Sequence, residues 1–250
     1  MDLAMRIADW DGFKARKKDA KKRGKLLGLG LANYVESSIG SPRERAEITV
    51  KPEGKVTVVI GTQPSGQGHE TSFAQVIESW LGVPSKDVNL VTGDSDIVIE
   101  GGGTHSDRSI RLGGFVMVKA SEQIIEKGRK IAAHLLECAS DDLEFDSGTF
   151  TVKGSPEKKK TVQECIFAAY QSDLPDEMEK GFEDVTYYDA PEMTYPFGTY
   201  ICVVDIDKGT GQVKVRKFVA VDDCGTRINP MIVDGQIHGG LTQGFGTAMM

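Results

Sequence analysis

Two glycine-rich stretches about one helix length apart constrain this chain more than any other feature. They comprise residues 61–71 and 101–109, and both combine several glycines with hydrogen-bonding side chains. Glycine lets the backbone approach a bulky ligand and adopt positive φ. Clustered backbone N–H groups at turns and helix starts bind anionic oxygens, and hydroxyl, amide and guanidinium groups add directed hydrogen bonds. The two stretches therefore predict a wall around a large, polar cofactor that carries phosphate.

Composition and charge exclude several other classes of partner. The chain has 250 residues and a formal net charge of -7, with a pI of about 5.2, which argues against nucleic acid. No apolar run approaches the ~20 residues of a membrane span, so we expect no transmembrane segment. The N-terminus lacks the apolar region of a signal peptide. The cysteines form no C-x-x-C pair, which argues against iron–sulfur and zinc sites in this chain and favours a reduced, cytoplasmic location.

Helical periodicity follows each glycine-rich stretch. Residues 70–81 carry an apolar stripe at helical spacing and stop at Gly82. Residues 113–138 repeat the pattern after the second stretch, and strands are expected before the stretches at 55–60 and 87–92. The order of strand, polar glycine loop and helix therefore occurs twice. The free N–H groups at the start of the first helix should face the ligand.

The remaining elements predict an α+β fold with mixed sheets and packed helices, not a regular βαβ repeat. We expect a solvated helix at 8–25, strands at 26–35 and 46–51, strand and turn at 140–160, a helix at 161–170, a surface loop at 171–194, and a hairpin of strands 199–207 and 212–221.

A third polar segment that contains glycine follows the last expected strand. Residues 222–230 lead into a helix that should begin near Pro230, because proline suits the first helical turn. Five glycines lie within 235–246, and each disfavours an exposed helix by about 1 kcal/mol. We therefore expect close packing against other backbone or a ligand. A buried helix of small residues remains an alternative, but Cys224 and Asn229 at the entrance favour a ligand.

Single residues leave alternatives open. His69 and His105 lie within the glycine loops, where contact with a ligand and no contact are equally supported, and no third ligand at suitable spacing makes them a metal pair. Asp222 and Asp223 could act as acid and base, or could equally cap a turn. No G-x-x-x-x-G-K-[ST] segment is present, which excludes a P-loop. The residues alone assign no metal ligand.

Several motifs in a fixed order carry a family resemblance. They are G-Q-G-H-E-T at 66–71, G-T-H-S-D-R-S at 103–109, Y-P-F-G-T-Y at 195–200, D-D-C-G-T-R-I-N-P-M-I at 222–232 and G-Q-I-H-G-G at 235–240. Together they resemble the large, molybdenum-binding subunit of the xanthine dehydrogenase family, and are most similar to the large chains of aerobic carbon monoxide dehydrogenases and their relatives. The resemblance implies part of the molybdopterin-binding domain of a molybdenum hydroxylase. Such an oxidoreductase oxidises carbon monoxide, an aldehyde or a heterocycle with oxygen from water.

The resemblance also implies a cofactor, partners and binding residues. Molybdenum is held by the dithiolene of molybdopterin, expected as the cytosine dinucleotide, with no direct metal ligand from the protein. Electrons leave through 2Fe-2S clusters and FAD on an iron–sulfur small subunit and a flavin-binding medium subunit, in a dimer of heterotrimers. The residues that match the family's cofactor loops are Gln67, Gly68 and His69 in the first, Thr104, Ser106, Arg108 and Ser109 in the second, and Cys224, Asn229 and Gln236 in the third.

Two family elements fall outside the matched region. The general-base glutamate would follow Met250, so no catalytic residue is assigned. The substrate-facing loop, which carries a copper-binding cysteine in carbon monoxide dehydrogenases, would precede Met1. The resemblance therefore implies a fragment that needs the remaining parts of the large subunit and is inactive alone. Its domains would be an N-terminal helix and connecting segment at 1–45 and a molybdopterin-binding region at 46–250, which could divide into α+β subdomains at 46–140 and 141–250.

Two other functions are consistent with parts of the sequence. A non-catalytic assembly or interaction module that retains the fold would also lack the base, although three intact glycine-containing segments favour the enzyme. A stand-alone nucleotide- or phosphate-binding protein would explain the glycine loops, but not the segment from Cys224 to Gln236.

Overall fold

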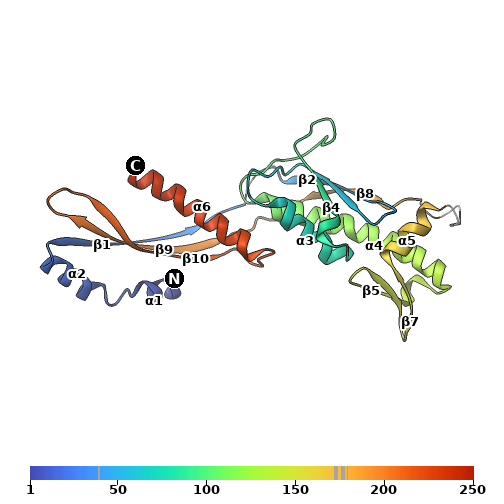
Figure 1. Cartoon of the computed structure of the whole chain (residues 1–250), viewed down its shortest axis with the longest axis horizontal. Coiled ribbons are helices and arrows are strands. Elements are labelled where there is room, and N and C mark those ends of the chain that lie inside the picture. The colour runs from blue at the N-terminus through green and yellow to red at the C-terminus, as the bar shows by residue number, and fades with distance from the viewer. Residues whose placement is uncertain (39, 172–173, 176–177, 179) are drawn as a thin grey trace. The chain divides into compact units, whose positions relative to one another are not determined.

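The computed structural model describes residues 1–38, 40–171, 174–175, 178 and 180–250. Figure 1 shows the chain, which divides into two compact units. The first unit comprises Met1–Ser38 and Met193–Thr226, and the second comprises Ile39–Glu192 and Arg227–Met250. These interleaved units differ from the expected succession of segments at 1–45 and 46–250. The reason is that an N-terminal strand pairs with a strand far along the chain.

The first unit is a three-stranded antiparallel sheet with helices on one face. Its strands are β1 (Lys25–Val35), β9 (Phe197–Asp207) and β10 (Val213–Asp223), in the order β1-β9-β10. Helices α1 (Asp2–Ala8) and α2 (Phe13–Lys22) lie along this sheet (Figure 1). Ala4, Ala8, Ile201 and Val219 form its small core. The hairpin of β9 and β10 is confirmed. The helix expected at 8–25 is shorter, since only α2 (Phe13–Lys22) forms within that range, and the separate helix α1, which ends where Asp9 adopts a φ of 51°, was not expected.

The second unit is built on a four-stranded mixed sheet. Its strands are β2 (Arg43–Val50), β3 (Val56–Ile60), β4 (Val88–Val91) and β8 (Glu183–Asp189), in the order β4-β3-β2-β8. The hairpin of β2 and β3 is confirmed, and β3 and β4 are parallel because α3 (His69–Leu81) connects them.

The prediction of a surface loop at 171–194 is wrong at β8, which forms a strand there. Part of the range 171–194 lies outside the described residues. The half-buried positions of β8 are Asp184, Thr186 and Tyr188, so the face that packs inward is mostly polar and gives little signal of a strand. Pairing with the sequence-distant β2 creates it.

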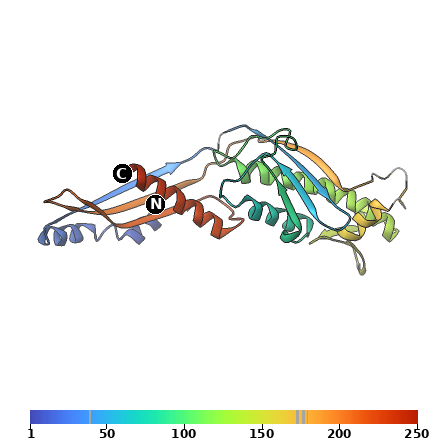
Figure 2. The ribbon, with the colours of Figure 1, turned by 45° about the horizontal axis from the view of Figure 1, so that its top comes forward.

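Helices cover the mixed sheet and form the main core. Helix α4 (Gly114–Leu136), preceded by a π-helical turn (Ser109–Gly113), runs along β2 and β8, as Figure 2 shows. The buried residues include Ile48, Val58, Phe73, Ile77, Met117 and Ile124. A small antiparallel sheet of β5 (Leu143–Asp146), β6 (Thr149–Val152) and β7 (Ser155–Thr161) packs on α4 together with α5 (Val162–Tyr170). Single 3-10 turns occupy Ser85–Asp87 and Ser140–Asp142.

The last helix, α6 (Pro230–Met249), is exposed or half-buried along its length. It begins at Pro230 as expected, and the Asn229 side chain caps it. None of its residues is buried. Apart from the adjoining backbone of the helix itself, no heavy atom of the described residues lies within 4 Å of where a Cβ would sit on any of its five glycines in 235–246. The close packing predicted for these glycines is therefore not found among the described residues.

Candidate functional site

The two glycine loops lie directly against each other in the second unit. We refer to residues 61–68 as the first loop and to residues 101–109 as the second loop. A Cβ added to Gly61 would overlap the Cα of Gly101, so the two backbones touch where only glycine fits. Thr104 Oγ1 donates a hydrogen bond of 2.6 Å to the carbonyl oxygen of Gln63. Segments about forty residues apart in the sequence (Gly61 and Gly101) thus form one polar surface.

The first loop leads into α3 through two left-handed glycines. Gly66 has a φ of 110° and Gly68 a φ of 73°, conformations that favour glycine over other residues. Gly68 occupies the N-cap position of α3, which has no side-chain cap. The Gln67 carboxamide oxygen accepts hydrogen bonds from the backbone N–H and the hydroxyl of Ser65. The side-chain oxygen of Gln67 is therefore hydrogen-bonded within the loop, while its NH2 group has no hydrogen-bond partner among the described residues.

His69 lies under the first loop and supports it. Its side chain is 5% exposed, and its ring stacks on Phe73 with centroids 4.9 Å apart. Nδ1 lies 3.0 Å from the Thr62 carbonyl oxygen. This distance assigns the proton to Nδ1, because a carbonyl oxygen can only accept. Through this contact His69 supports the shape of the first loop.

The second loop contains a strained turn. Ser106 and Asp107 have φ values of 50° and 58°, and a non-glycine residue in this region costs of order 1–3 kcal/mol. His105 is exposed, and its Nε2 lies 3.1 Å from the Gly102 carbonyl oxygen, while Nδ1 lies 3.2 Å from Ser106 Oγ. Nε2 therefore donates to Gly102 and Nδ1 accepts from Ser106. Strain of this kind persists only where the surrounding structure enforces it.

The Arg108 side chain is buried and hydrogen-bonded within the protein. Its side chain is 1% exposed and pairs with Glu44, which is fully buried, at 2.6 Å. Four of its five N–H groups are used by Glu44 and by the carbonyl oxygens of Ser41, Arg43 and Gly103. The resemblance implies a cofactor-binding role for Arg108, and in this structure most of its N–H groups hold the second loop.

Two hydroxyl groups in the loops are buried without hydrogen-bond partners among the described residues. They are Thr62 Oγ1 and Ser109 Oγ. Leaving a buried polar group unsatisfied costs about 1–3 kcal/mol, so their retention calls for a reason. One lies in each of the two loops, so each loop contains a hydroxyl whose hydrogen bonding is not met by the described residues.

The start of α6 docks onto the start of α3. Asn229 Oδ1 accepts from the Ile232 backbone N–H at 3.1 Å, and its Nδ2 donates to Gln75 Oε1 at 2.9 Å. A Cβ on Gly68 would lie 2.9 Å from Ile232 Cδ1, so Ile232 sits on the first loop. Asn229 therefore serves as a cap and a link between helices. Gln236, almost two turns further along α6, is exposed.

Cys224 lies in the first unit, after a strand end that two tyrosines anchor. Tyr34 Oη donates to Asp222 Oδ1 at 2.6 Å. Burial, and then this carboxylate, raise the pKa of Tyr34 well above its ordinary value of 10.0. Burial and Asp222 also raise the pKa of Tyr200. The geometry thus supports an anchoring role for Asp222 over an acid–base role, and Cys224 itself is exposed.

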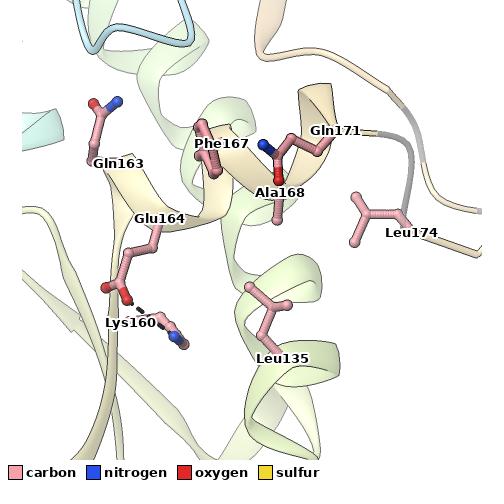
Figure 3. A pocket seen from close by; sticks show the side chains of 8 residues that line it. All are labelled: Leu135, Lys160, Gln163, Glu164, Phe167, Ala168, Gln171 and Leu174. Atoms are coloured by element: carbon pink, nitrogen blue, oxygen red, sulfur yellow. Dashed lines mark hydrogen bonds and ion pairs between the residues drawn. The ribbon is translucent and has the colours of Figure 1, made fainter.

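Two hollows lie elsewhere and contain none of the predicted site residues. Figure 3 shows one of about 480 Å³ between α4 and α5, where Lys160 and Glu164 form an ion pair of 3.0 Å. The other, of about 710 Å³, lies in the first unit beside Arg16 and Arg216. Within the part of the chain that the structure describes, no group of three or more His, Cys, Asp or Glu could hold a metal ion. None of its helices has the length and apolar character that crossing a bilayer requires.

Three contributors to the site were not predicted from the sequence. Glu44, Thr62 and Gln75 hold Arg108, His69 and Asn229 respectively. Only Glu44 leaves a sequence signal, because it is a carboxylate in phase with Ala46 and Ile48, which face the core from the same strand. The contacts of Thr62 and Gln75 depend on tertiary packing.

Comparison with known proteins decides the family. The family model of a molybdopterin cofactor-binding domain matches residues 3–250, nearly the whole chain. This chain belongs to that family. The two glycine loops and the start of α6 are therefore parts of a molybdopterin-binding domain, and the predicted α+β fold of mixed sheets and packed helices is confirmed.

The chain is similar in sequence to the large subunits of known enzymes. The chain is 45% identical over 247 residues to the carbon monoxide dehydrogenase large chain of Afipia carboxidovorans, a match that covers 93% of this chain and 30% of that one. It is 33% identical over 263 residues to the nicotine 6-hydroxylase large subunit of Paenarthrobacter nicotinovorans, covering 100% and 32%. The chain thus spans about a third of the length of the curated relatives it matches.

Solved structures agree with the sequence comparison. The crystal structure of a Cu,Mo-CO dehydrogenase matches with a TM-score of 0.92 and 43% identity, over 99% of this chain and 33% of that chain. Quinoline 2-oxidoreductase from Pseudomonas putida 86 matches with a TM-score of 0.89 and 34% identity, over 98% and 33%. The relatives of this molybdopterin-binding domain are oxidoreductases with different substrates.

Proposed function

We propose that this chain holds the pterin and phosphate groups of a molybdenum cofactor within the large subunit of a molybdenum hydroxylase. The observation that carries the proposal is the contact between the two glycine loops at the uncapped start of α3, in a chain of the molybdopterin-binding family. When bound, the cofactor supplies a molybdenum centre that accepts two electrons from the substrate. The base that activates water is assigned to other parts of the subunit.

The first loop suits the anionic part of the cofactor. The N–H groups of Thr71 and Ser72 return to the Gly68 carbonyl oxygen, which leaves those of His69 and Glu70 for an anion. The positive end of the helix dipole favours phosphate at this position. At Gly66, no heavy atom of the described residues lies within 4 Å of where a Cβ would sit, so the backbone is open to close approach.

Polar side chains around the loops suit directed recognition. Gln67 has an NH2 group to donate, and Ser106 Oγ, which donates to His105, keeps its lone pairs for a ligand donor. Thr104 holds the loops together through its hydroxyl. In the third segment, the family resemblance assigns the amide of Gln236 and the thiol of Cys224 to the cofactor, and both side chains are exposed. Arg108, His69 and Asn229 act indirectly, by fixing the backbone that carries these groups.

The finer assignments rest on the relatives. We assign the cytosine dinucleotide form of molybdopterin, with FAD and 2Fe-2S clusters on a medium and a small partner subunit, in a dimer of heterotrimers in the cytoplasm. Support comes from the similarity to a carbon monoxide dehydrogenase large chain and a nicotine 6-hydroxylase large subunit, whose names imply further subunits. The substrate class is carbon monoxide, an aldehyde or a heterocycle.

The experiment compares Gln67→Ala and Gln236→Ala with the control Gln123→Ala, an exposed glutamine on α4. Each is made in the complete large subunit, produced with its partner subunits. A lost hydrogen bond to a buried ligand is worth about 1–3 kcal/mol, or roughly 5- to 150-fold in affinity. Molybdenum and pterin content should fall in the first two variants, with the melting temperature of cofactor-free protein unchanged. Acid hydrolysis should release CMP from the wild type.

The outcomes separate the candidate functions. If molybdenum content is unchanged in both test variants, Gln67 and Gln236 do not bind the cofactor. A wild-type complex that contains neither molybdenum nor pterin would favour the non-catalytic module that keeps the fold. Bound nucleotide without pterin would favour the stand-alone nucleotide-binding protein.

A further inference from the structure

A buried ion pair lies behind the second loop. Arg108 heads the largest fully buried side chains of the described residues, and its Nη1 lies 2.6 Å from Glu44 Oε2. Glu44 also accepts from the backbone N–H groups of Gly102, at 3.3 Å, and Arg45, at 3.2 Å. The pair therefore joins the first residues of β2 to both sides of the turn that begins the second loop.

The surroundings of the pair are shaped to fit it. A Cβ on Gly102 would overlap the Arg108 guanidinium, and one on Gly61 would lie 3.0 Å from Glu44 Oε1. A Cβ on Gly40 would lie 3.3 Å from Arg108 Cδ. Glycines from both loops and from the segment before β2 thus make room for the two charged side chains.

Stability alone does not account for this arrangement. Desolvating two charges often costs more than their attraction returns, and apolar residues of similar volume commonly stabilise a fold as well or better. What the ion pair adds is directed hydrogen bonding. Arg108 Nη1, Nη2 and Nε reach the carbonyl oxygens of Gly103, Arg43 and Ser41 at 2.6, 2.8 and 3.2 Å. An apolar pair could fill the volume, but it could not fix those carbonyls.

We propose that Glu44 and Arg108 are positioning residues that hold the second loop in its cofactor-binding shape. This inference rests on the proposed function. The strained residues Ser106 and Asp107 lie between two fixed points, the backbone at Gly102 and Gly103 and the anchored side chain of Arg108. Conformations of this kind persist only where surrounding structure enforces them. The pair enforces this one, and through it the direction of the Ser106 hydroxyl.

The test uses Arg108→Lys and the double variant Glu44→Leu/Arg108→Met, in the complete large subunit with its partner subunits. Lysine keeps the charge but cannot reach Glu44 and three carbonyl oxygens together. Molybdenum retained per folded molecule is followed by metal analysis during dialysis, beside the melting temperature. Loss of an indirect positioning contact typically weakens metal binding 10–100-fold. We expect roughly tenfold faster cofactor loss in both variants, with the melting temperature of the double variant restored to near that of the wild type.

The controls distinguish failure of this inference from failure of the proposed function. Gln67→Ala reports the direct contact, and Gln123→Ala reports the effect of an exposed substitution. If Gln67→Ala loses cofactor while Arg108→Lys retains it as the wild type does, the positioning role is wrong and the function stands. If the double variant matches the wild type in both melting temperature and cofactor retention, the ion pair only fills space and the positioning role is also wrong. If the wild-type complex contains neither molybdenum nor pterin, the proposed function itself fails.

Discussion

Replacing Gly61 by alanine is expected to separate the two glycine loops. The added Cβ would overlap the Cα of Gly101, and ordinary Cβ contacts begin near 3.4 Å, so the backbones would have to part by roughly 1 Å. Overpacking of this kind costs about 1–3 kcal/mol. Losing the hydrogen bond from Thr104 to Gln63 adds about 0.5–1.5 kcal/mol. The free energy of unfolding should therefore fall by about 1.5–4.5 kcal/mol.

The matched control is Gly114→Ala at the start of α4. There the added Cβ would meet Ile110 Cδ1 at 3.6 Å, an ordinary contact, and the φ of -59° suits any residue. Alanine should be neutral or stabilise this helix by up to about 1 kcal/mol. Denaturant unfolding of the complete subunit and its molybdenum content are measured for both variants. If Gly61→Ala is as stable and as rich in molybdenum as Gly114→Ala, the loops do not form a shared surface.

Two further results follow from local contacts. Asn229→Ala should cost about 1 kcal/mol through loss of the N-cap, seen as faster amide exchange in the first turn of α6, while Asn229→Asp keeps the cap and should exchange at close to the wild-type rate. Asp207 accepts from Lys25 and from the N–H groups of Thr210 and Gly209, which hold its pKa below the ordinary 3.8. A depressed pKa stabilises the fold above the unfolded value and loses that effect as pH falls below it. Acid titration should therefore destabilise the wild-type first unit below about pH 4, and Asp207→Asn should flatten that part of the profile. An unaltered profile would contradict the pairing.

Local patterns were enough to predict part of the fold. The hairpin of β2 and β3, the helix α3 after the first loop, and the hairpin of β9 and β10 each rest on short-range periodicity and turn residues. Strand β8 was missed because its pairing with β2 is distant and its inner face is polar. The interleaving of the two units was missed for a similar reason, since β1 finds its partner β9 only in the folded chain.

The candidate site was likewise predicted where its signal is local in the sequence and missed where it depends on tertiary contacts. The sequence located both loops, because glycines with polar neighbours are a local signal. It did not reveal that Arg108 faces Glu44, because that pairing joins residues 64 positions apart. It also predicted close packing for the glycines of α6, which depends on whatever covers that helix and not on the helix itself.

The most direct measurement of the central claim is the crystal structure of the complete large subunit with its partners, with molybdenum located by anomalous scattering. The account predicts one molybdenum peak per large subunit. It also predicts pterin and phosphate density in contact with Gln67, with Ser106 and with the first turn of α3. Density that touches neither glycine loop, with the cofactor bound elsewhere in the subunit, would contradict it.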